Sequence, residues 1–276
     1  MDESYVDRRG GSSPREDASP VDVFKTFVRF LLLGFGSLVL VSLIQILLIG
    51  VSGIPVPIPE NEPELQIIVQ TISFLSLGLG TLIVAGAYLQ NSGRDWSFVD
   101  VTLPSIRDLA WTLGGFVILL VGFLAVTYLF SLLGLSPAEH SSTDTVASAS
   151  QELIALFVVA QLLVVGPGEE LLYRNVIQKS MYGTVGKLPA VVLASIIFAL
   201  VHIPAYSLGG ASLSGVATTL TAIFVLSLVL GGVYVRTGNV VVPALIHAAY
   251  NALSFYSTYA SGGGSGGGTE ALVWLF

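Results

Sequence analysis

Seven long apolar stretches dominate this sequence and limit what the chain can fold into. They cover residues 26–50, 65–89, 109–135, 152 to about 180, 188–203, 215–235 and 240–259. An α-helix needs about 20 mostly apolar residues to cross about 30 Å of hydrocarbon, whereas a membrane β-barrel shows short alternating segments. Only 11% of the residues are charged, against about 25% in soluble domains. We therefore predict an all-α polytopic transmembrane helical bundle of about seven spans, located in the cell membrane.

The 11 basic residues predict how this bundle is oriented. Cytoplasmic loops retain Lys and Arg, whereas acidic residues have little influence on topology. With seven spans, every Lys and Arg falls on one side of the membrane, and the segments 51–64, 136–151 and 204–214 on the other side contain none. We expect the N-terminus to be cytoplasmic and the C-terminus to lie outside.

These patterns divide the chain into four parts. Residues 1–25 read as a disordered cytoplasmic tail, residues 26–135 as three transmembrane helices, residues 152–260 as a transmembrane core, which the polar residues described below predict to be catalytic, and residues 261–276 as a Gly-rich tail. Pro167 lies inside the fourth stretch, where we expect it to kink the helix. A net charge of −7 argues against a nucleic-acid partner, and the absence of cysteine excludes disulfides and a cysteine nucleophile.

Ionisable residues are distributed unevenly among the spans. Each one at the centre of a bilayer costs about 2.5 to 3.5 kcal/mol, so it needs a partner or a function. The first three stretches contain no acid, histidine or lysine beyond their ends. The last four contain a polar set consisting of Glu169, Glu170, Arg174, His202, His247 and Asn251. Any catalytic function therefore belongs to the C-terminal half.

Residues four apart share one face of a helix, while adjacent residues diverge by about 100°. Glu170 and Arg174 have this spacing and are expected to form an ion pair. Glu169 then points elsewhere and has no cation nearby in the sequence. An unpaired carboxylate inside a membrane span is a candidate general base.

The same spacing pairs Phe198 with His202 and His247 with Asn251. A glutamate beside histidines can activate a water molecule as a general base. The histidines can bind a divalent metal or polarise the water, and the Asn251 amide can donate to a developing oxyanion. Peptide-bond hydrolysis is a natural outcome of this set.

Three segments of the C-terminal half resemble the three motifs of the CAAX-protease and bacteriocin-processing (CPBP, or Abi) family. They are EELLYR at 169–174, FALVH at 198–202 and HAAYN at 247–251. Each motif alone is weakly specific, but here all three occur in order on successive helices. The resemblance covers about residues 152–260. Type II CAAX endopeptidases of that family cleave prenylated proteins, so the resemblance implies an intramembrane endopeptidase acting on membrane-associated, CAAX-like peptide or protein substrates.

The resemblance also implies a role for each motif residue. Glu169 would activate the water, His202 and His247 would complete the active centre with help from Asn251, and Glu170 and Arg174 would form a supporting ion pair beside Phe198. One departure is Asn175, where the family often has glycine, and we expect it to alter packing rather than chemistry. A divalent metal such as zinc, with His202 and His247 as ligands, and a metal-free centre of glutamate and histidine both remain open.

Other functions fit the sequence less well. It contains no H-E-x-x-H zinc motif and no aspartate inside a span, and only Ser214-Gly215 faintly resembles an intramembrane serine-protease motif. An ion-coupled transporter would also place Glu and His inside a bundle, but no internal repeat is present. A non-proteolytic scaffold or immunity protein would not need the complete set of motifs.

Overall fold

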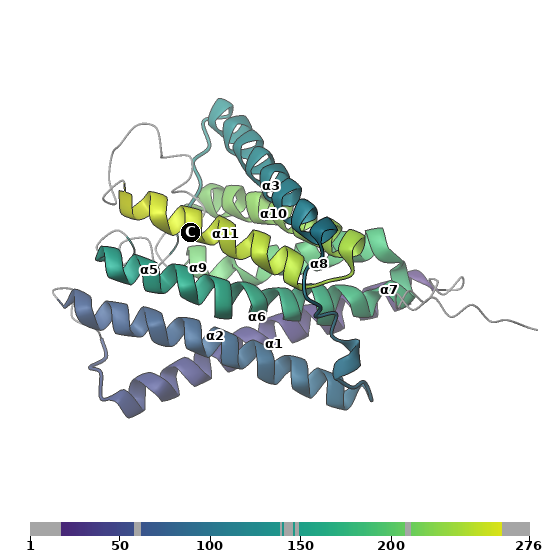
Figure 1. The fold of residues 1–276 in the computed structure, drawn as a ribbon, viewed down its shortest axis with the longest axis horizontal. Helices are drawn as coiled ribbons and strands as arrows, with labels where there is room; N and C mark the ends of the chain where they lie inside the picture. The colour runs from purple at the N-terminus through teal and green to yellow at the C-terminus, as the bar shows by residue number, and fades with distance from the viewer. Residues whose placement is uncertain are drawn as a thin grey trace, which may run out of the picture.

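The structure is a computed structural model that describes residues 18–57, 62–138, 140, 146, 149–207 and 211–260. Within these residues all regular structure is helical, and the helices lie side by side in one bundle (Figure 1). The elements are α1 (Pro20–Ser52), α2 (Pro63–Asn91), the 3₁₀ turn η1 (Trp96–Phe98), α3 (Ile106–Leu132), α5 (Gln151–Ala160), the π-helical η2 (Gln161–Val165), α6 (Gly166–Glu170), the π-helical η3 (Leu171–Gln178), α7 (Lys179–Val185), α8 (Lys187–Val201), α9 (Ile203–Ser207), α10 (Leu213–Thr237) and α11 (Val241–Ala260).

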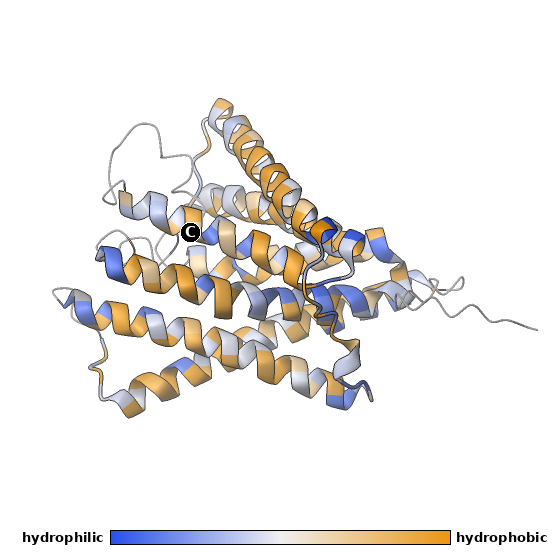
Figure 2. Cartoon of the chain, in the orientation of Figure 1, coloured by the Kyte–Doolittle hydropathy of each residue, from blue (hydrophilic) through white to orange (hydrophobic). Residues whose placement is uncertain are grey.

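The predicted all-α membrane bundle is confirmed, and the chain is a multi-pass membrane protein. Six helical spans are long and apolar enough to cross a membrane: 20–52, 64–91, 106–132, 151–185, 187–207 and 213–237. The seventh predicted span corresponds to α11, which has 20 residues but is less apolar because it carries the His247 and Asn251 motif. The outer surface is apolar. In α1, for example, only 11% of the most apolar part is buried inside the protein, so most of its apolar side chains face outward. Figure 2 shows hydrophobic residues over most of the helices and hydrophilic residues gathered at their ends.

Helix α1 starts six residues before the predicted apolar stretch. Ser19 and Asp22 form a capping box, in which the Ser19 hydroxyl accepts from the Asp22 N–H at 3.2 Å and the Asp22 carboxylate accepts from the Ser19 N–H at 3.1 Å. Pro20 occupies the first helical turn, where its missing N–H costs nothing. Residues 20–25 are therefore helical. The rest of the predicted N-terminal tail, 1–17, and the predicted C-terminal tail, 261–276, lie outside the described residues.

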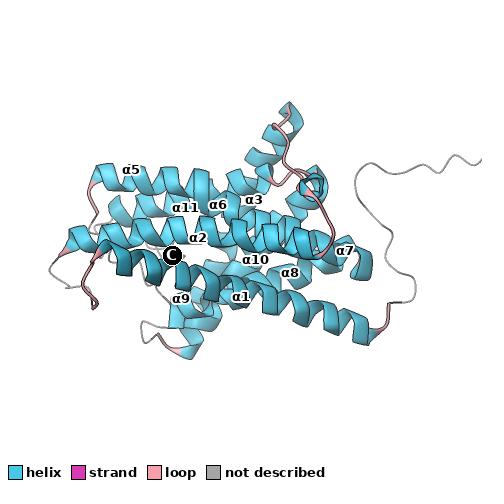
Figure 3. Cartoon of the chain, turned by 90° about the horizontal axis from the view of Figure 1, so that it is seen from below, coloured by secondary structure: helices cyan, strands magenta, loops and turns pink. Residues whose placement is uncertain are grey.

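The chain reverses direction with each span. In Figure 1, α1 begins at the right end of the bundle, α2 ends there, α3 begins there, and the alternation continues through α7, α8, α10 and α11. Figure 3 shows the same lengthwise packing from below. Most Lys and Arg residues of the described chain lie toward this end, because they occupy the helix termini and loops that meet there. We call it the basic end.

The fourth span continues through Pro167 as one helical segment from Gln151 to Val185. Pro167 sits in the first turn of α6, and π-helical segments precede and follow α6. Such wide turns inside a helix occur frequently at functional sites. Gly166 and Gly168 flank the proline and allow close approach. A Cβ at 166 would lie 3.0 Å from the Ala244 carbonyl of α11, and one at 168 would lie 2.6 Å from the Thr81 hydroxyl of α2.

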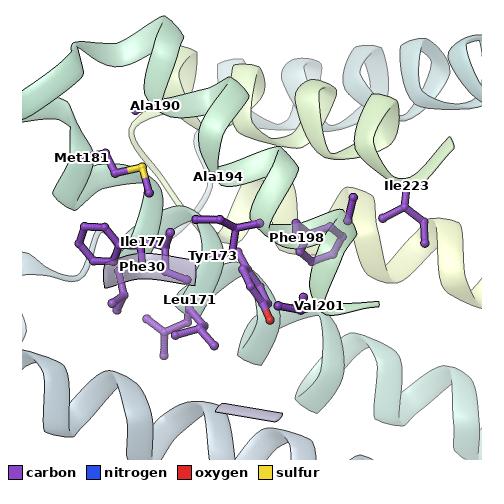
Figure 4. Close-up of a cluster of buried hydrophobic side chains, with 14 of the residues drawn as sticks. Phe30, Leu171, Tyr173, Ile177, Met181, Ala190, Ala194, Phe198, Val201 and Ile223 are labelled. Carbon is purple, nitrogen blue, oxygen red and sulfur yellow. The ribbon is translucent and has the colours of Figure 1, made fainter. Parts of the chain in front are cut away.

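The largest apolar core joins α1, α2, the fourth span and α8. Figure 4 shows its side chains, with Tyr173 beside Phe198 and with Met181 and Ile177 near Phe30. The Tyr173 and Phe198 rings meet edge to face with their centroids 4.9 Å apart. This packing fixes the EELLYR segment against the FALVH segment, so two of the three motifs are held together by apolar contacts.

Candidate active site

Glu170 and Arg174 form the predicted ion pair, and both side chains are fully buried. The Arg174 guanidinium donates from Nε to Glu170 Oε2 at 2.7 Å and from Nη1 to the Ser227 hydroxyl of α10 at 2.8 Å. The guanidinium also lies 4.9 Å from the centroid of the Phe198 ring. These contacts connect the fourth span to α8 and α10 and leave Arg174 no role in the cavity described below.

Glu169 is less buried than Glu170, with 13% of its side chain exposed. Among the described residues it has no Lys or Arg ion-pair partner. Its nearest charged or titratable partner is His247, whose Nε2 lies 3.6 Å from Glu169 Oε2. A separation of this size is long for a direct hydrogen bond and suits a bridging water.

His247 contacts both adjacent glutamates, although their side chains diverge on the helix. Its Nδ1 lies 3.0 Å from Glu170 Oε1, while Nε2 faces Glu169. The two carboxylates diverge along their helix, but an imidazole has nitrogens pointing in two directions and so can reach both. Because a carboxylate can only accept, Nδ1 carries the proton of this hydrogen bond. Glu170 therefore orients the His247 ring as well as neutralising Arg174.

His202 lies where α8 meets α9, and its ring is fixed by its own helix. Nδ1 donates to the Phe198 carbonyl at 2.6 Å, which leaves Nε2 directed away from the backbone. The Phe198 ring lies against the imidazole of His202 in a tilted contact, with centroids 4.6 Å apart, and meets the His247 ring edge to face at 5.9 Å. Phe198 therefore contacts both histidines.

Asn251 lies one turn beyond His247 on α11. Its side-chain amide donates to Gln161 Oε1 at 2.8 Å. Gln161 belongs to the π-helical segment before Pro167 and is buried. This contact fixes the orientation of the Asn251 amide, so that its carboxamide is held at the edge of the site.

One cavity of about 250 Å³ joins the candidate residues. Its polar lining consists of Gln70, Ser73, His140, Gln161, Glu169, His202, Tyr206, His247, Tyr250 and Asn251. Its apolar lining comes from α2, α3, the fourth span, α8, α10 and α11. A water molecule occupies about 30 Å³ in the liquid, so this space admits a water together with a peptide group. Four predicted catalytic residues face one space, whereas Glu170 and Arg174 lie behind it.

His140 is a cavity residue that the sequence analysis did not identify. It lies in the connection between α3 and α5 and meets the Tyr206 ring edge to face at 5.1 Å. The preceding Ala138 is tethered to α10, because its N–H and carbonyl both bond to the Thr219 hydroxyl, at 2.9 and 3.2 Å. Burial, with a smaller effect from the nearby His202, lowers the pKa of His140 to about 4. The chain has three histidines, and all of them line this cavity.

Gln161 was also missed, although the sequence carries a signal for it. It is the only strongly polar residue between Leu153 and Val165, in an otherwise apolar half-span. His140 carries a weaker signal, its rarity, and nothing in the sequence around it indicates that its side chain lines the cavity. Asn175 has the packing role expected for it. It is buried, and its side chain accepts from the Asp100 N–H at 2.8 Å and donates to the Phe98 carbonyl at 3.2 Å.

The site has some, but not all, of the features of a divalent-metal site. His202 and His247 each engage Nδ1 with an oxygen and leave Nε2 directed elsewhere, as metal-binding histidines do. In the part of the chain that the structure describes, however, no three His, Asp or Glu side chains are grouped closely enough to hold an ion. The donor types suit zinc, but their spacing does not assemble a ligand set. Metal binding by His202 and His247 stays a prediction.

Comparison with known proteins supports a family assignment. Residues 151–253 match the family described as type II CAAX prenyl endopeptidase Rce1-like. The UPF0177 protein YxdF of Lactococcus lactis subsp. lactis (strain IL1403) is 27% identical over 170 residues, which cover 59% of this chain and 80% of that protein. No solved structure matches. The matched region begins with the fourth span and ends after the third motif, so it contains every residue of the site except those from α2, α3, the α3–α5 connection and the end of α11. By this match, the C-terminal core of the chain, residues 151–253, is similar to the type II CAAX prenyl endopeptidase family.

Proposed function

We propose that this protein is an intramembrane endopeptidase that hydrolyses peptide bonds of membrane-associated substrates with a water activated by Glu169. One observation carries the proposal. The Glu169 carboxylate faces a cavity shared with two imidazoles and an amide, while the adjacent Glu170 is engaged by Arg174. A purely structural glutamate would be expected to have a Lys or Arg as its partner, and among the described residues Glu169 has neither.

The first step is attack of water on the scissile carbonyl. A water between Glu169 Oε2 and His247 Nε2 gives one proton to Glu169, and its oxygen adds to the carbonyl carbon. The negative charge then develops on the former carbonyl oxygen. Donors for that oxyanion are the Asn251 amide and the His247 ring, the latter in its protonated form with Glu170 accepting from Nδ1.

The second step is cleavage of the carbon–nitrogen bond. The protonated Glu169 returns its proton to the departing nitrogen, the carbonyl reforms, and the products are a carboxylic acid and an amine, which become a carboxylate and an ammonium when the acid gives its proton to the amine. Two carboxylates and one guanidinium leave the buried group with one net negative charge. A proton on His247 would bring Glu169, Glu170, Arg174 and His247 to neutrality, which favours a cationic ring beside the oxyanion.

The proposed substrates are peptides or proteins attached to or embedded in the bilayer, with a prenylated CAAX-like C-terminus as the specific form. The family match supports this class. The cavity lies inside a bundle whose outer surface is apolar, so a substrate held in the lipid phase has the shortest path to it.

Proteolysis by the purified protein in lipid nanodiscs tests the proposal. Quenched fluorescent peptides ending in a CAAX sequence, with and without a prenyl group, serve as substrates. Glu169→Gln should lower turnover by about 10²- to 10⁴-fold. Glu152→Gln is the matched control, because Glu152 lies on the same span, is exposed, and bonds to Ser150. Undiminished cleavage by Glu169→Gln would exclude Glu169 as the base, and no cleavage by the wild type would favour a scaffold or a transporter.

Metal dependence needs a separate test, because the proposed chemistry does not require an ion. If zinc takes part, it would supply a Lewis acid next to the water, with His202 and His247 as ligands. Metal content per folded molecule should then fall in His202→Ala and in His247→Ala. Full activity after exhaustive chelation would leave Glu169 and the histidines to act alone.

A further inference from the structure

A polar hollow of about 510 Å³ lies at the basic end of the bundle, away from the catalytic cavity. Its lining includes four cationic side chains, Arg107, Lys179, Lys187 and Arg236, and two carboxylates, Asp100 and Asp108. The hollow therefore carries two more positive than negative charges. The whole chain has the opposite balance, with 18 acidic and 11 basic residues.

The carboxylates of this hollow are already engaged. Asp100 accepts from Lys179 Nζ at 2.8 Å and from the Tyr234 hydroxyl at 2.5 Å. Asp108 caps α3, where it accepts from the Ser105 hydroxyl at 2.8 Å and from the Ser105 N–H at 2.9 Å. Both carboxylates therefore already have partners, and neither requires a further cation.

The remaining cations have no such partners. Among the described residues, Arg107, Lys187 and Arg236 form no ion pair, and all three are exposed. They come from the start of α3, the start of α8 and the end of α10, so three separate helices present them around one space. Helix termini of a membrane-spanning bundle lie near the level of the lipid headgroups. Three unpaired cations around a hollow at this level suit a phosphate group.

An apolar groove of about 820 Å³ is lined in part by the same chain segment as the hollow. The same chain segment lines both, with Ser97 and Asp100 in the hollow and Trp96, Val99 and Val101 in the groove. The groove continues along α2, the fourth span and α11, on the apolar outer surface. A charged site next to an apolar channel fits an amphipathic ligand better than a free anion.

We propose that the basic hollow binds the phosphate headgroup of an anionic phospholipid, whose acyl chains lie along the apolar groove. Basic pockets between transmembrane helices are known to hold such headgroups, at about 1 kcal/mol for each cation near the surface. This inference is independent of peptidase activity. The proposed site predicts that the protein binds anionic lipid more tightly than zwitterionic lipid, and that this preference depends on Arg107, Lys187 and Arg236.

The test is lipid titration of the detergent-purified full chain, read by native mass spectrometry. Phosphatidylglycerol should bind more tightly than phosphatidylcholine with the same acyl chains. Lys187→Gln, Arg107→Gln and Arg236→Gln should each weaken phosphatidylglycerol binding by roughly five-fold, the ratio that corresponds to about 1 kcal/mol. Lys25→Gln is the matched control, because Lys25 is exposed near the same end but does not line the hollow.

Three results would overturn the proposal. Equal binding of the two lipids would remove the role of charge, and an equal effect of Lys25→Gln would reduce it to the general charge of the basic end. Competition by glycerol phosphate as effective as that by phosphatidylglycerol would identify a soluble phosphate as the ligand. Thermal melting of each variant without added lipid should match the wild type, which confirms that loss of binding is not loss of fold.

Discussion

Glu169 and Glu170 are neighbours in the sequence, yet their side chains meet different surroundings. Glu170 is fully buried with Arg174, whereas Glu169 faces the cavity. Replacing Glu170 leaves the Arg174 charge buried with only the Ser227 hydroxyl as a close polar partner. Breaking a buried pair in this way costs about 3 to 5 kcal/mol. The consequence should be a loss of stability, in contrast to the loss of turnover expected for Glu169→Gln.

We therefore expect Glu170→Gln to melt at a clearly lower temperature than the wild type in detergent, while Glu169→Gln melts close to it. Turnover per folded molecule completes the comparison. Because Glu170 also orients His247, some loss of turnover in Glu170→Gln is expected as well. A stable but inactive Glu170→Gln, together with an unstable but active Glu169→Gln, would reverse the two assignments.

His140 gives the site a dependence on pH. Its pKa falls from 6.5 to about 4 on folding, so the unfolded chain binds the proton more readily. The contribution of His140 to the free energy of unfolding is therefore constant above pH 6.5 and declines as the pH falls from 6.5 toward 4. The upper bound on this loss of stability is about 3 kcal/mol, at about 1.4 kcal/mol for each pKa unit. Thermal melting at pH 7.5 and pH 5 should show a smaller decline in His140→Gln than in the wild type, and an equal decline would show that other groups control it.

The motif residues of the site could be predicted from the sequence because their spacing is local. Glu170 and Arg174, Phe198 and His202, and His247 and Asn251 are each four apart on a helix, so one turn brings each pair to one face. His140 and Gln161 could not be found in this way. His140 meets Tyr206 and Gln161 meets Asn251, and both contacts are set by packing between distant segments.

At the level of elements, the helix that carries Glu169 is positioned by glycines. Gly166 touches α11 so closely that an added methyl group would lie 3.0 Å from both the Ala244 carbonyl and the Ala248 methyl. The backbone carbonyl cannot move aside without shifting α11, which carries His247 and Asn251. Overpacking of this kind typically costs about 1 to 3 kcal/mol.

Gly166→Ala should therefore lower both the melting temperature and the turnover. Gly232→Ala on α10 is the matched control, since a methyl group there meets nothing within 4 Å. Melting in detergent and peptide cleavage in nanodiscs measure the two effects. If both variants behave like the wild type, the α6–α11 contact is looser than the structure shows.

The path of the fourth span shows where prediction from sequence stops. Apolar length correctly indicated that the span exists, and the helix continues through Pro167 between two π-helical segments, which the sequence did not indicate. A proline lacks the N–H that an α-helical bond needs, and a wider turn changes which carbonyl is left unpaired. Whether a helix bends or widens depends on its neighbours, here the close contacts of Gly166 and Gly168 with other helices. Such contacts cannot be inferred from the sequence of the helix alone.

At the scale of the whole molecule, the alternating direction of the spans follows from their number and from the loops that join them. The least apolar crossing is α11, which contains His247, Asn251 and several hydroxyl side chains. It is nevertheless well buried, with His247 only 8% exposed. Protein neighbours rather than lipid surround its polar face, which explains how a span of lower hydropathy can be accommodated. Topology therefore depends on whether α11 crosses the bilayer.

A reporter fused after Phe276 should lie outside the cell, and one inserted after Asn91 should lie in the cytoplasm. Asn91 ends α2 at the basic end, and Lys and Arg are retained on the cytoplasmic side. A third insertion after Val56, where the flanking connection has no basic residue, should report the outside and serves as an internal control. If the Phe276 and Asn91 reporters lie on one side while the Val56 reporter lies on the other, α11 does not cross. His247 and Asn251 would then enter the site from the cytoplasmic face, and the predicted seven-span topology would be wrong.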